Sequence, residues 1–218
     1  MRIDFQGLSI STDSDDAVAG LERFTTELLS HGKQADAILA GAEADADCAL
    51  VQACAAALFL FLHTKAGCER AAPFLVRAEA CFDRANEREK IFVTAVMHWS
   101  RGDLAAAVRC HEEIAKRWPQ DLLSAKICQI HQLSLGWSKS MQATAARVLT
   151  ANPQNNYAMG LLAFAEEQNG DRRSAERRGR EAVDLEPECD PWSQHAVAHV
   201  LMARSAAAEG RDWLQPMA

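Results

Sequence analysis

The chain has 218 residues, 49% of them apolar, so it is long enough to bury a core without disulfides or metal ions. Its formal net charge of -7 argues against nucleic acid as a partner, because surfaces that bind phosphates are basic. Ala and Leu dominate the apolar residues, whereas aromatic residues make up only 6% of the chain. Ala and Leu favour helices, while strands favour β-branched and aromatic side chains. The composition therefore predicts an all-α protein.

Helical periodicity predicts a series of helices that begins near residue 13. In chain order, the expected ranges are about 13–31, 34–44, 47–65, 69–84, 87–101, 103–118, 121–135, 138–151, 155–169, 171–185, 190–204 and 206–214. Asp13 or Ser14 is a typical cap for the first helix, and Asn86 for the fifth. The most apolar run, 49–62, is shorter than the roughly 20 residues that a bilayer span needs. It predicts a buried helix, and no membrane partner is expected.

Two residue types recur with a period of 34 residues. The glycines are Gly102, Gly136 and Gly170, and the prolines are Pro119, Pro153 and Pro187. Each glycine lies between two helical stretches, where a left-handed backbone costs little only for Gly. Each proline follows the second stretch, since proline cannot continue a helix. One step further on, Ser205 stands near the position of the next glycine. A period of 34 with this punctuation is typical of tetratricopeptide repeats.

The repeat predicts the fold class. We expect a right-handed α-α superhelix, that is, a tetratricopeptide-like solenoid of antiparallel helix pairs. No linker rich in Pro, Gly or Ser divides the chain, so one domain over residues 1–218 is expected. Its parts are degenerate hairpins over about 13–85, clearer repeats over about 88–121, 122–155 and 156–189, and a terminal hairpin over 190–214.

Three segments carry a resemblance to a known family. These are GLSISTDSDDAVAGLERFTTELL, REKIFVTAVMHWSRGDLAAAVRCHEEIAKRWPQDLLSAKI and YAMGLLAFAEEQNGDRRSAERRGREAVDLEPECDPWSQHAVAHVLMARSAAAEGRDWL. They are similar to bacterial members of the tetratricopeptide repeat protein 38 family. The resemblance implies architecture and little about activity. Members of that family carry further hairpins beyond the equivalent of Trp213, so we expect a naturally short relative or an N-terminal piece.

A solenoid of this type typically holds a peptide or partner segment in a concave groove, which the first helix of each repeat lines. The groove candidates are His98, His131, Gln132 and Glu166, all on expected first helices. The leading functional hypothesis is therefore a non-catalytic protein–protein interaction scaffold. The seven cysteines form no CxxC pair and no secretory leader precedes them, which favours reduced thiols in the cytoplasm.

The alternative hypothesis is a metal-dependent enzyme or a small-molecule-binding solenoid around His195 and His199. The two histidines stand four residues apart and hence on one helix face, where two imidazoles can chelate Zn²⁺. No cofactor is otherwise expected, because a third ligand is missing and the intervening Ala-Val-Ala supplies no general base. The sequence also lacks a phosphate-binding loop and a GxSxG elbow, so an enzyme is the less favoured reading.

Other clusters have ordinary explanations. Cys128 and His131 share a helix face, but buried thiols are common in helical cores. Five arginines between residues 172 and 180 can form ion pairs with nearby acidic residues, which is typical of a solvated helix face. At the C-terminal end, an uncapped hairpin would expose apolar side chains and favour a homodimer. The side chains expected there are Leu201, Met202, Trp213 and Leu214.

Overall fold

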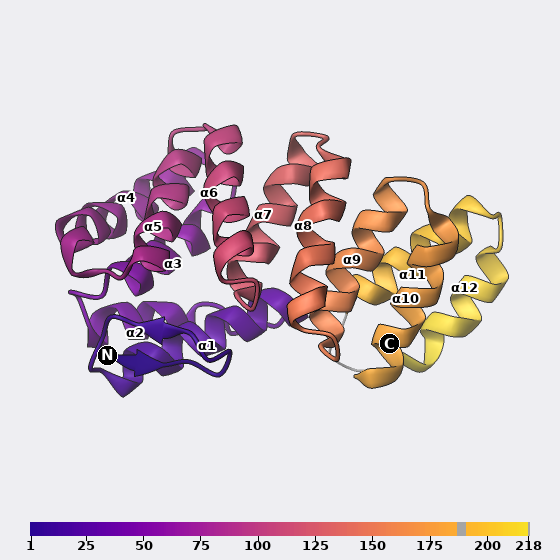
Figure 1. Ribbon diagram of the computed structural model, residues 1–218, viewed down its shortest axis with the longest axis horizontal. Helices are drawn as coiled ribbons and strands as arrows, with labels where there is room; N and C mark the ends of the chain where they lie inside the picture. Colours follow the sequence, from indigo (N-terminus) through magenta and orange to yellow (C-terminus); the bar gives the residue numbers. More distant parts are fainter. Residues whose placement is uncertain (187–190, 218) are drawn as a thin grey trace. The chain divides into compact units, whose positions relative to one another are not determined.

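A computed structural model describes residues 1–186 and 191–217, and this part of the chain contains twelve α-helices (Figure 1). Pro187, which the repeat analysis singles out, lies outside the described residues. The chain divides into two compact units, Met1–His131 and Gln132–Ala218. The single domain and the right-handed superhelix stay predictions. Within residues 1–186 and 191–217, no helix is both long enough and apolar enough to cross a bilayer.

The first unit contains a short β-hairpin and three helix pairs. Its elements are β1 Arg2–Ile3, β2 Ser9–Ile10, α1 Asp15–Ser30, α2 Ala37–Ala44, α3 Ala49–Leu60, α4 Lys65–Ala80, η1 Phe82–Arg84, α5 Glu87–Ser100, α6 Leu104–Arg117 and most of α7 Leu122–Ser134. In each pair the second helix packs against the first: α2 on α1, α4 on α3 and α6 on α5. Each helix predicted between residues 13 and 135 therefore corresponds to an observed one.

The second unit continues the pairs from the end of α7. Its further elements are α8 Ser138–Ala151, α9 Asn156–Gln168, α10 Arg172–Leu185, α11 Pro191–Ala203, α12 Ala207–Leu214 and η2 Gln215–Met217. Here α10 packs on α9 and α12 packs on α11, while α9 also contacts α8 and α11. The described residues thus form an all-α fold of sequential helix pairs.

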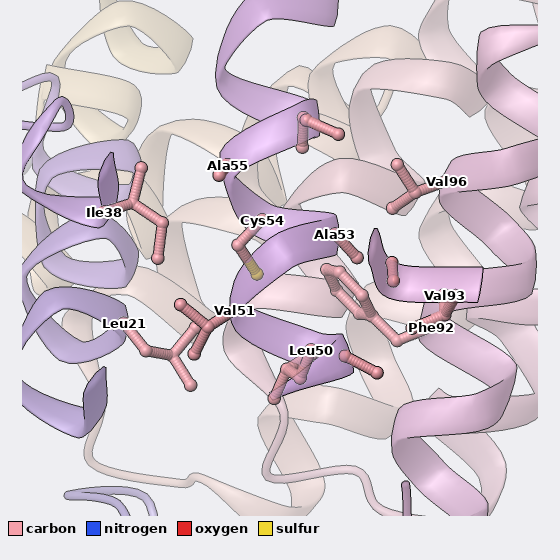
Figure 2. Packing of buried hydrophobic residues seen from close by; sticks show 14 of the residues in the cluster. Leu21, Ile38, Leu50, Val51, Ala53, Cys54, Ala55, Phe92, Val93 and Val96 are labelled. Atoms are coloured by element: carbon pink, nitrogen blue, oxygen red, sulfur yellow. The ribbon is translucent and has the colours of Figure 1, made fainter. Parts of the chain in front are cut away.

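Helix α3 forms the centre of the first unit. Eleven of its twelve residues are buried, so it is apolar on every side, as expected of a helix enclosed by others. Figure 2 shows Val51 and Cys54 on the side of Leu21 and Ile38, while Ala53 faces the side from which Phe92 projects. The single buried polar side chain of α3, Gln52, donates through Nε2 to the Ala42 carbonyl (2.7 Å).

The glycines with the 34-residue spacing close the hairpins. Gly102, Gly136 and Gly170 have φ angles of +79°, +69° and +84°. At the first, the amide of Gly102 donates to the Trp99 carbonyl (2.9 Å) and that of Asp103 to the His98 carbonyl (3.0 Å). This pair of bonds is the Schellman motif, which satisfies the last carbonyls of a helix. The same pair recurs at Gly136, at Gly170 and at Ser205, whose φ is +59°.

The prolines mark the ends of the second helices. Trp118 and Asn152 precede Pro119 and Pro153, and both have non-helical backbones, with φ/ψ of -133°/67° and -129°/59°. Proline disfavours helical geometry in the residue before it, so α6 and α8 end at this point. Two residues after each proline, a short polar side chain caps the next helix: Asp121 accepts from the Ser124 amide (2.8 Å) and Asn155 from the Ala158 amide (2.9 Å).

Two local predictions were wrong. The third helix ends at Leu60 and the fourth begins at Lys65, because His63 has a φ of +50° and Thr64 caps α4 by accepting from the Gly67 amide (3.0 Å). The β-hairpin was not predicted either. It turns at Asp4, whose Oδ1 accepts from the Gln6 and Leu8 amides (2.9 and 2.8 Å), and it lies beside α1 (Figure 1).

The segment that follows this turn is bound to the N-terminal end of α5. Arg88 forms an ion pair with Asp121 (2.7 Å), in which both side chains are more than nine-tenths buried, and it also donates to the Ser9 carbonyl (3.1 Å). The amide of Ser11 donates to Glu89 Oε1 (2.8 Å). These bonds hold the N-terminal segment on the helix pairs of the first unit, so it is part of that unit's core.

A change of residue at the turn tests the repeat register. A Cβ at Gly170 would meet no atom within 4 Å, so Gly170→Ala acts only through the backbone. We expect it to lower the free energy of unfolding by about 1 kcal/mol, because an L-residue is strained at positive φ. The converse change, Ser205→Gly, should raise the free energy of unfolding by about 0.5–1 kcal/mol. Urea denaturation measures both free energies of unfolding. If the two variants change stability in the same direction, the assignment of residues 170 and 205 to equivalent turn positions is contradicted.

Close helix packing in the second unit gives another prediction. A Cβ at Gly179 would lie 2.6 Å from Val197 Cγ2 and 3.2 Å from the Ser193 carbonyl oxygen. Gly179→Ala should therefore lower the free energy of unfolding by about 1–3 kcal/mol through overpacking of α10 on α11. Val197→Ala removes the methyl group in the way, so the double variant should lose less stability than the two single losses summed. If the stability losses of the two single variants add exactly in the double variant, the contact between positions 179 and 197 is contradicted.

Candidate functional site

Three of the groove candidates occupy the same place in successive repeats. At the three glycine turns, the carbonyls of His98, Gln132 and Glu166 accept the hydrogen bond that spans five residues. Their side chains start from the last turn of a first helix, next to the second helix of the same hairpin. The environment of each side chain therefore depends on what the second helix presents to it.

Gln132 and Glu166 are buried, with 0% and 5% of their surface exposed. Gln132 Nε2 donates to Thr144 Oγ1 (3.3 Å), and Glu166 accepts from Arg178 Nε and Nη2 (3.1 Å each). Both partners lie twelve residues further on, in the second helix of the same hairpin. In this structure the two side chains hold their hairpins together, and neither lines an open surface.

His98 differs from the other two. Its side chain is 34% exposed, and its Nδ1 lies 3.8 Å from Asp103 Oδ2. Asp103 is also the N-cap of α6, because its Oδ1 accepts from the Ala106 amide (2.9 Å). Of the four groove candidates, His98 alone has a side chain that is accessible in this structure.

His131, the fourth groove candidate, is only 1% exposed. Its ring contacts Trp99 edge-on, with centroids 4.7 Å apart, and lies 5.9 Å from the ring of His111. His111 is fully buried, and its Nδ1 lies 2.8 Å from Ser124 Oγ. Neither ring nitrogen of His131 has a hydrogen-bond partner among the described residues. The pair belongs to the core of the first unit.

Burial controls the protonation of these groups. Removal from water lowers the pKa of His111 to about 3, with a smaller contribution from His131. The same cause lowers the pKa of His131 to about 4, with a smaller contribution from His63. Burial also raises the pKa of the Cys128 thiol, which lies one helical turn before His131. The imidazoles are therefore neutral, and the thiol is protonated and inaccessible. This agrees with the interpretation that Cys128 and His131 are packed in a helical core.

His195 and His199 form an accessible pair on α11. Their ring centroids are 4.1 Å apart, and the planes are tilted by 49°. His195 is exposed, and the His199 side chain is 38% exposed. The rings of Phe164 and Trp192 lie 5.8 and 6.2 Å from that of His195. The structure thus brings the two histidines together on a surface shared by α9 and α11.

Glu167 on α9 adds a carboxylate to this surface. Its Oε2 lies 3.4 Å from His199 Nδ1, and its side chain is only 17% exposed. Across residues 1–186 and 191–217, no group of three or more His, Cys, Asp or Glu side chains is arranged to hold a metal ion. Sequence reasoning found the two histidines from their spacing but missed Glu167, Phe164 and Trp192. Of these, only Trp192 has a usable signal, since it stands three residues before His195.

The arginines of α10 are mostly paired. Arg178 binds Glu166, Arg177 lies 3.4 Å from Glu181, and Arg180 bridges Glu176 and Glu209 (3.0 and 3.1 Å). Arg204 joins the same two glutamates, at 2.6 and 3.1 Å. This network connects α10 to the last hairpin, so most of these arginines stabilise the packing of neighbouring helices. Arg177 instead forms its ion pair on the solvent-exposed face of α10.

The C-terminal end differs from the prediction at one residue. Leu201 is fully buried, so the expectation that it is exposed was wrong. Its side chain packs against Gly210 of α12, where an added Cβ would lie 3.6 Å from Leu201 Cβ, an ordinary contact distance. Trp213 and Leu214 are half-buried, and the Arg180 guanidinium lies 5.0 Å from the Trp213 ring centroid. Met202 is 71% exposed. A homodimer through this end stays a prediction.

The buried histidines make stability depend on pH. In the unfolded chain they take up protons below about pH 6.5, whereas in the folded state they resist protonation down to about pH 4 and 3. Their contribution to stability is therefore complete above pH 6.5 and is lost as the pH falls. At pH 5 each of the two buried histidines should lower the free energy of unfolding by about 2 kcal/mol relative to pH 7.5.

Urea denaturation at the two pH values measures this loss. His131→Phe should remove about half of it, since the aromatic ring remains and the titrating group does not. His98→Gln is the matched control, because it replaces a partly exposed histidine outside the buried pair. A loss that persists in full in His131→Phe would contradict the assignment.

Comparisons with known proteins support the fold. No family model matches the sequence. Among solved structures, the chain is similar to MamA 41-end from Desulfovibrio magneticus RS-1, with a TM-score of 0.52, 18% identity, and coverage of 74% of this chain and 92% of that one. It is also similar to an RS-1 MamA double mutant, with a TM-score of 0.50, 20% identity, and coverage of 72% and 89%. Identities this low show the fold alone: sequential helix pairs of the tetratricopeptide type.

Proposed function

We propose that this protein is a non-catalytic interaction scaffold of the tetratricopeptide type, which binds a peptide or a partner segment on the faces of its first helices. The observation that carries the proposal is the accessible face of α11. His195, Ala198, His199 and Met202 follow the spacing i, i+3, i+4 and i+7, so they share one side of the helix. All four are exposed or half-exposed.

The composition of this face supports binding over simple solvation. Trp192, which is half-buried, lies beside His195, and Met202 extends the surface along the helix. Aromatic residues and Met are enriched in protein–protein interfaces, whereas Lys, Glu and Asp are depleted. The second helix of the preceding hairpin, α10, is by contrast rich in paired charges. A partner that contacts the first helices would therefore meet apolar and imidazole groups.

The finer parts of the proposal come from the sequence. We include a relationship to the tetratricopeptide repeat protein 38 family, which the three segments quoted above support. We also include a cytoplasmic location, supported by cysteines without CxxC pairing. A protein or peptide is the partner class, because the acidic balance disfavours nucleic acid.

Site-specific photo-crosslinking tests where a partner binds. A photoreactive residue is placed at Ala198 on α11 or, as the matched control, at Arg173 on α10, and both proteins are expressed in the source cells. We expect one protein to be crosslinked at position 198 and not at 173. Ala198→Arg, which adds a long charged side chain to the α11 face, should then weaken binding of that protein at least about tenfold, or by about 1.4 kcal/mol.

Two results would contradict the proposal. One is a crosslinking pattern that is the same at both positions. The other is an unchanged affinity of the captured partner for the Ala198→Arg variant. Circular dichroism of each variant verifies that the helices are intact, so that a loss of binding is not a loss of folding.

A further inference from the structure

The histidine pair of α11 has the geometry of a small chelate. His195 and His199 are one helical turn apart, and their ring centroids are only 4.1 Å apart. Residues at i and i+4 of a helix project from the same face, so small rotations of the two rings can direct one nitrogen of each toward a common point. His195 is exposed and His199 is 38% exposed, so an ion from solvent can reach that point.

Glu167 selects the nitrogen that His199 offers. Its Oε2 lies 3.4 Å from Nδ1, and the negative charge at this distance favours the proton of the neutral ring on Nδ1 over Nε2. The lone pair is then left on Nε2. Around a metal-bound histidine, a carboxylate beside the second imidazole nitrogen is the usual arrangement, since it orients the ring and raises its basicity. Glu167 is itself only 17% exposed, which restricts its movement.

Aromatic neighbours restrict His195 in a similar way. Its ring centroid lies 5.8 Å from that of Phe164 and 6.2 Å from that of Trp192. Phe164 is buried, so one wall of this surface is fixed by the packing of α9. Restricted donors lose less rotamer freedom when they bind an ion, which favours binding.

We propose that His195 and His199 bind one divalent transition-metal ion of the class that prefers imidazole, such as Zn²⁺, Ni²⁺ or Cu²⁺, and that Glu167 is the positioning residue for His199. Imidazole nitrogen suits these ions, whereas Mg²⁺ and Ca²⁺ require oxygen ligands. The chain supplies two donors and water fills the other positions, so the ion is exchangeable. Protons compete for the same nitrogens, so affinity falls as the pH is lowered.

Calorimetric titration with ZnCl₂ tests the site on the full chain, without any partner protein. Among the described residues Cys68 is exposed and Cys110 half-exposed, so Cys68→Ser and Cys110→Ser are introduced throughout to remove these two competing thiolates. We expect one Zn²⁺ per chain. His195→Ala and His199→Ala should each weaken binding roughly a hundredfold, because the second donor no longer acts intramolecularly. Glu167→Gln should weaken it about tenfold.

His98→Ala is the matched control for these variants. His98 is also about one-third exposed and also lies near a carboxylate, Asp103, but it has no second histidine one turn away. Its loss should leave the Zn²⁺ affinity unchanged, and MgCl₂ should give no binding. Absence of Zn²⁺ binding at millimolar concentration overturns the proposal, as does binding that survives His195→Ala or that falls equally in His98→Ala.

A second measurement does not depend on how the variants fold. Sub-stoichiometric Ni²⁺ broadens the NMR signals of nuclei close to it. In the protein with both cysteine replacements, the amides of α11 around residues 195–199 and of Glu167 should broaden first. Broadening that begins elsewhere in the chain overturns the assignment.

Discussion

Four hairpins, from α5–α6 to α11–α12, depend on the same backbone closure, in which two hydrogen bonds bridge the end of the first helix around a left-handed residue. The bonds at Gly102, Gly136, Gly170 and Ser205 have the same partners relative to the turn. The closure uses only main-chain atoms, so it tolerates changes in nearly every side chain around it. Asp103 and Asp171 follow two of the glycines and cap the next helix, whereas Trp137 follows the third and makes no side-chain cap. The hairpin turn survives this difference.

This dependence explains how much of the fold the sequence reveals. Gly and Pro report backbone geometry directly, so their spacing locates the repeats even where the helices have diverged. The boundary between α3 and α4 was misplaced because His63, not glycine, takes the left-handed position there. The N-terminal hairpin was missed because its strands of two residues are too short to show a period. Its signal was the turn around Gly7, at φ +77°, in DFQGL.

The candidate site was harder to predict, because the repeat register identifies equivalent positions without showing which of them are open. His98, Gln132 and Glu166 are equivalent, yet only the first is accessible. The difference comes from the second helix, where Thr144 and Arg178 bind the other two. His195 and His199 could be placed on one face from their spacing alone. Glu167 could not, because its approach to His199 requires the packing of α9 against α11.

The bond from a first-helix side chain to a residue twelve positions later also bears on how such repeats evolve. Gln132 with Thr144, and Glu166 with Arg178, are pairs contained within a single hairpin. Duplication of a whole hairpin copies both partners together, so the new repeat arrives with its polar contact intact. A cut between the two helices separates the partners and leaves a buried amide or carboxylate without its bond. For these two contacts, the hairpin is therefore the smallest segment that can be duplicated without losing a bond. Substitutions at the two residues of each pair are expected to occur together.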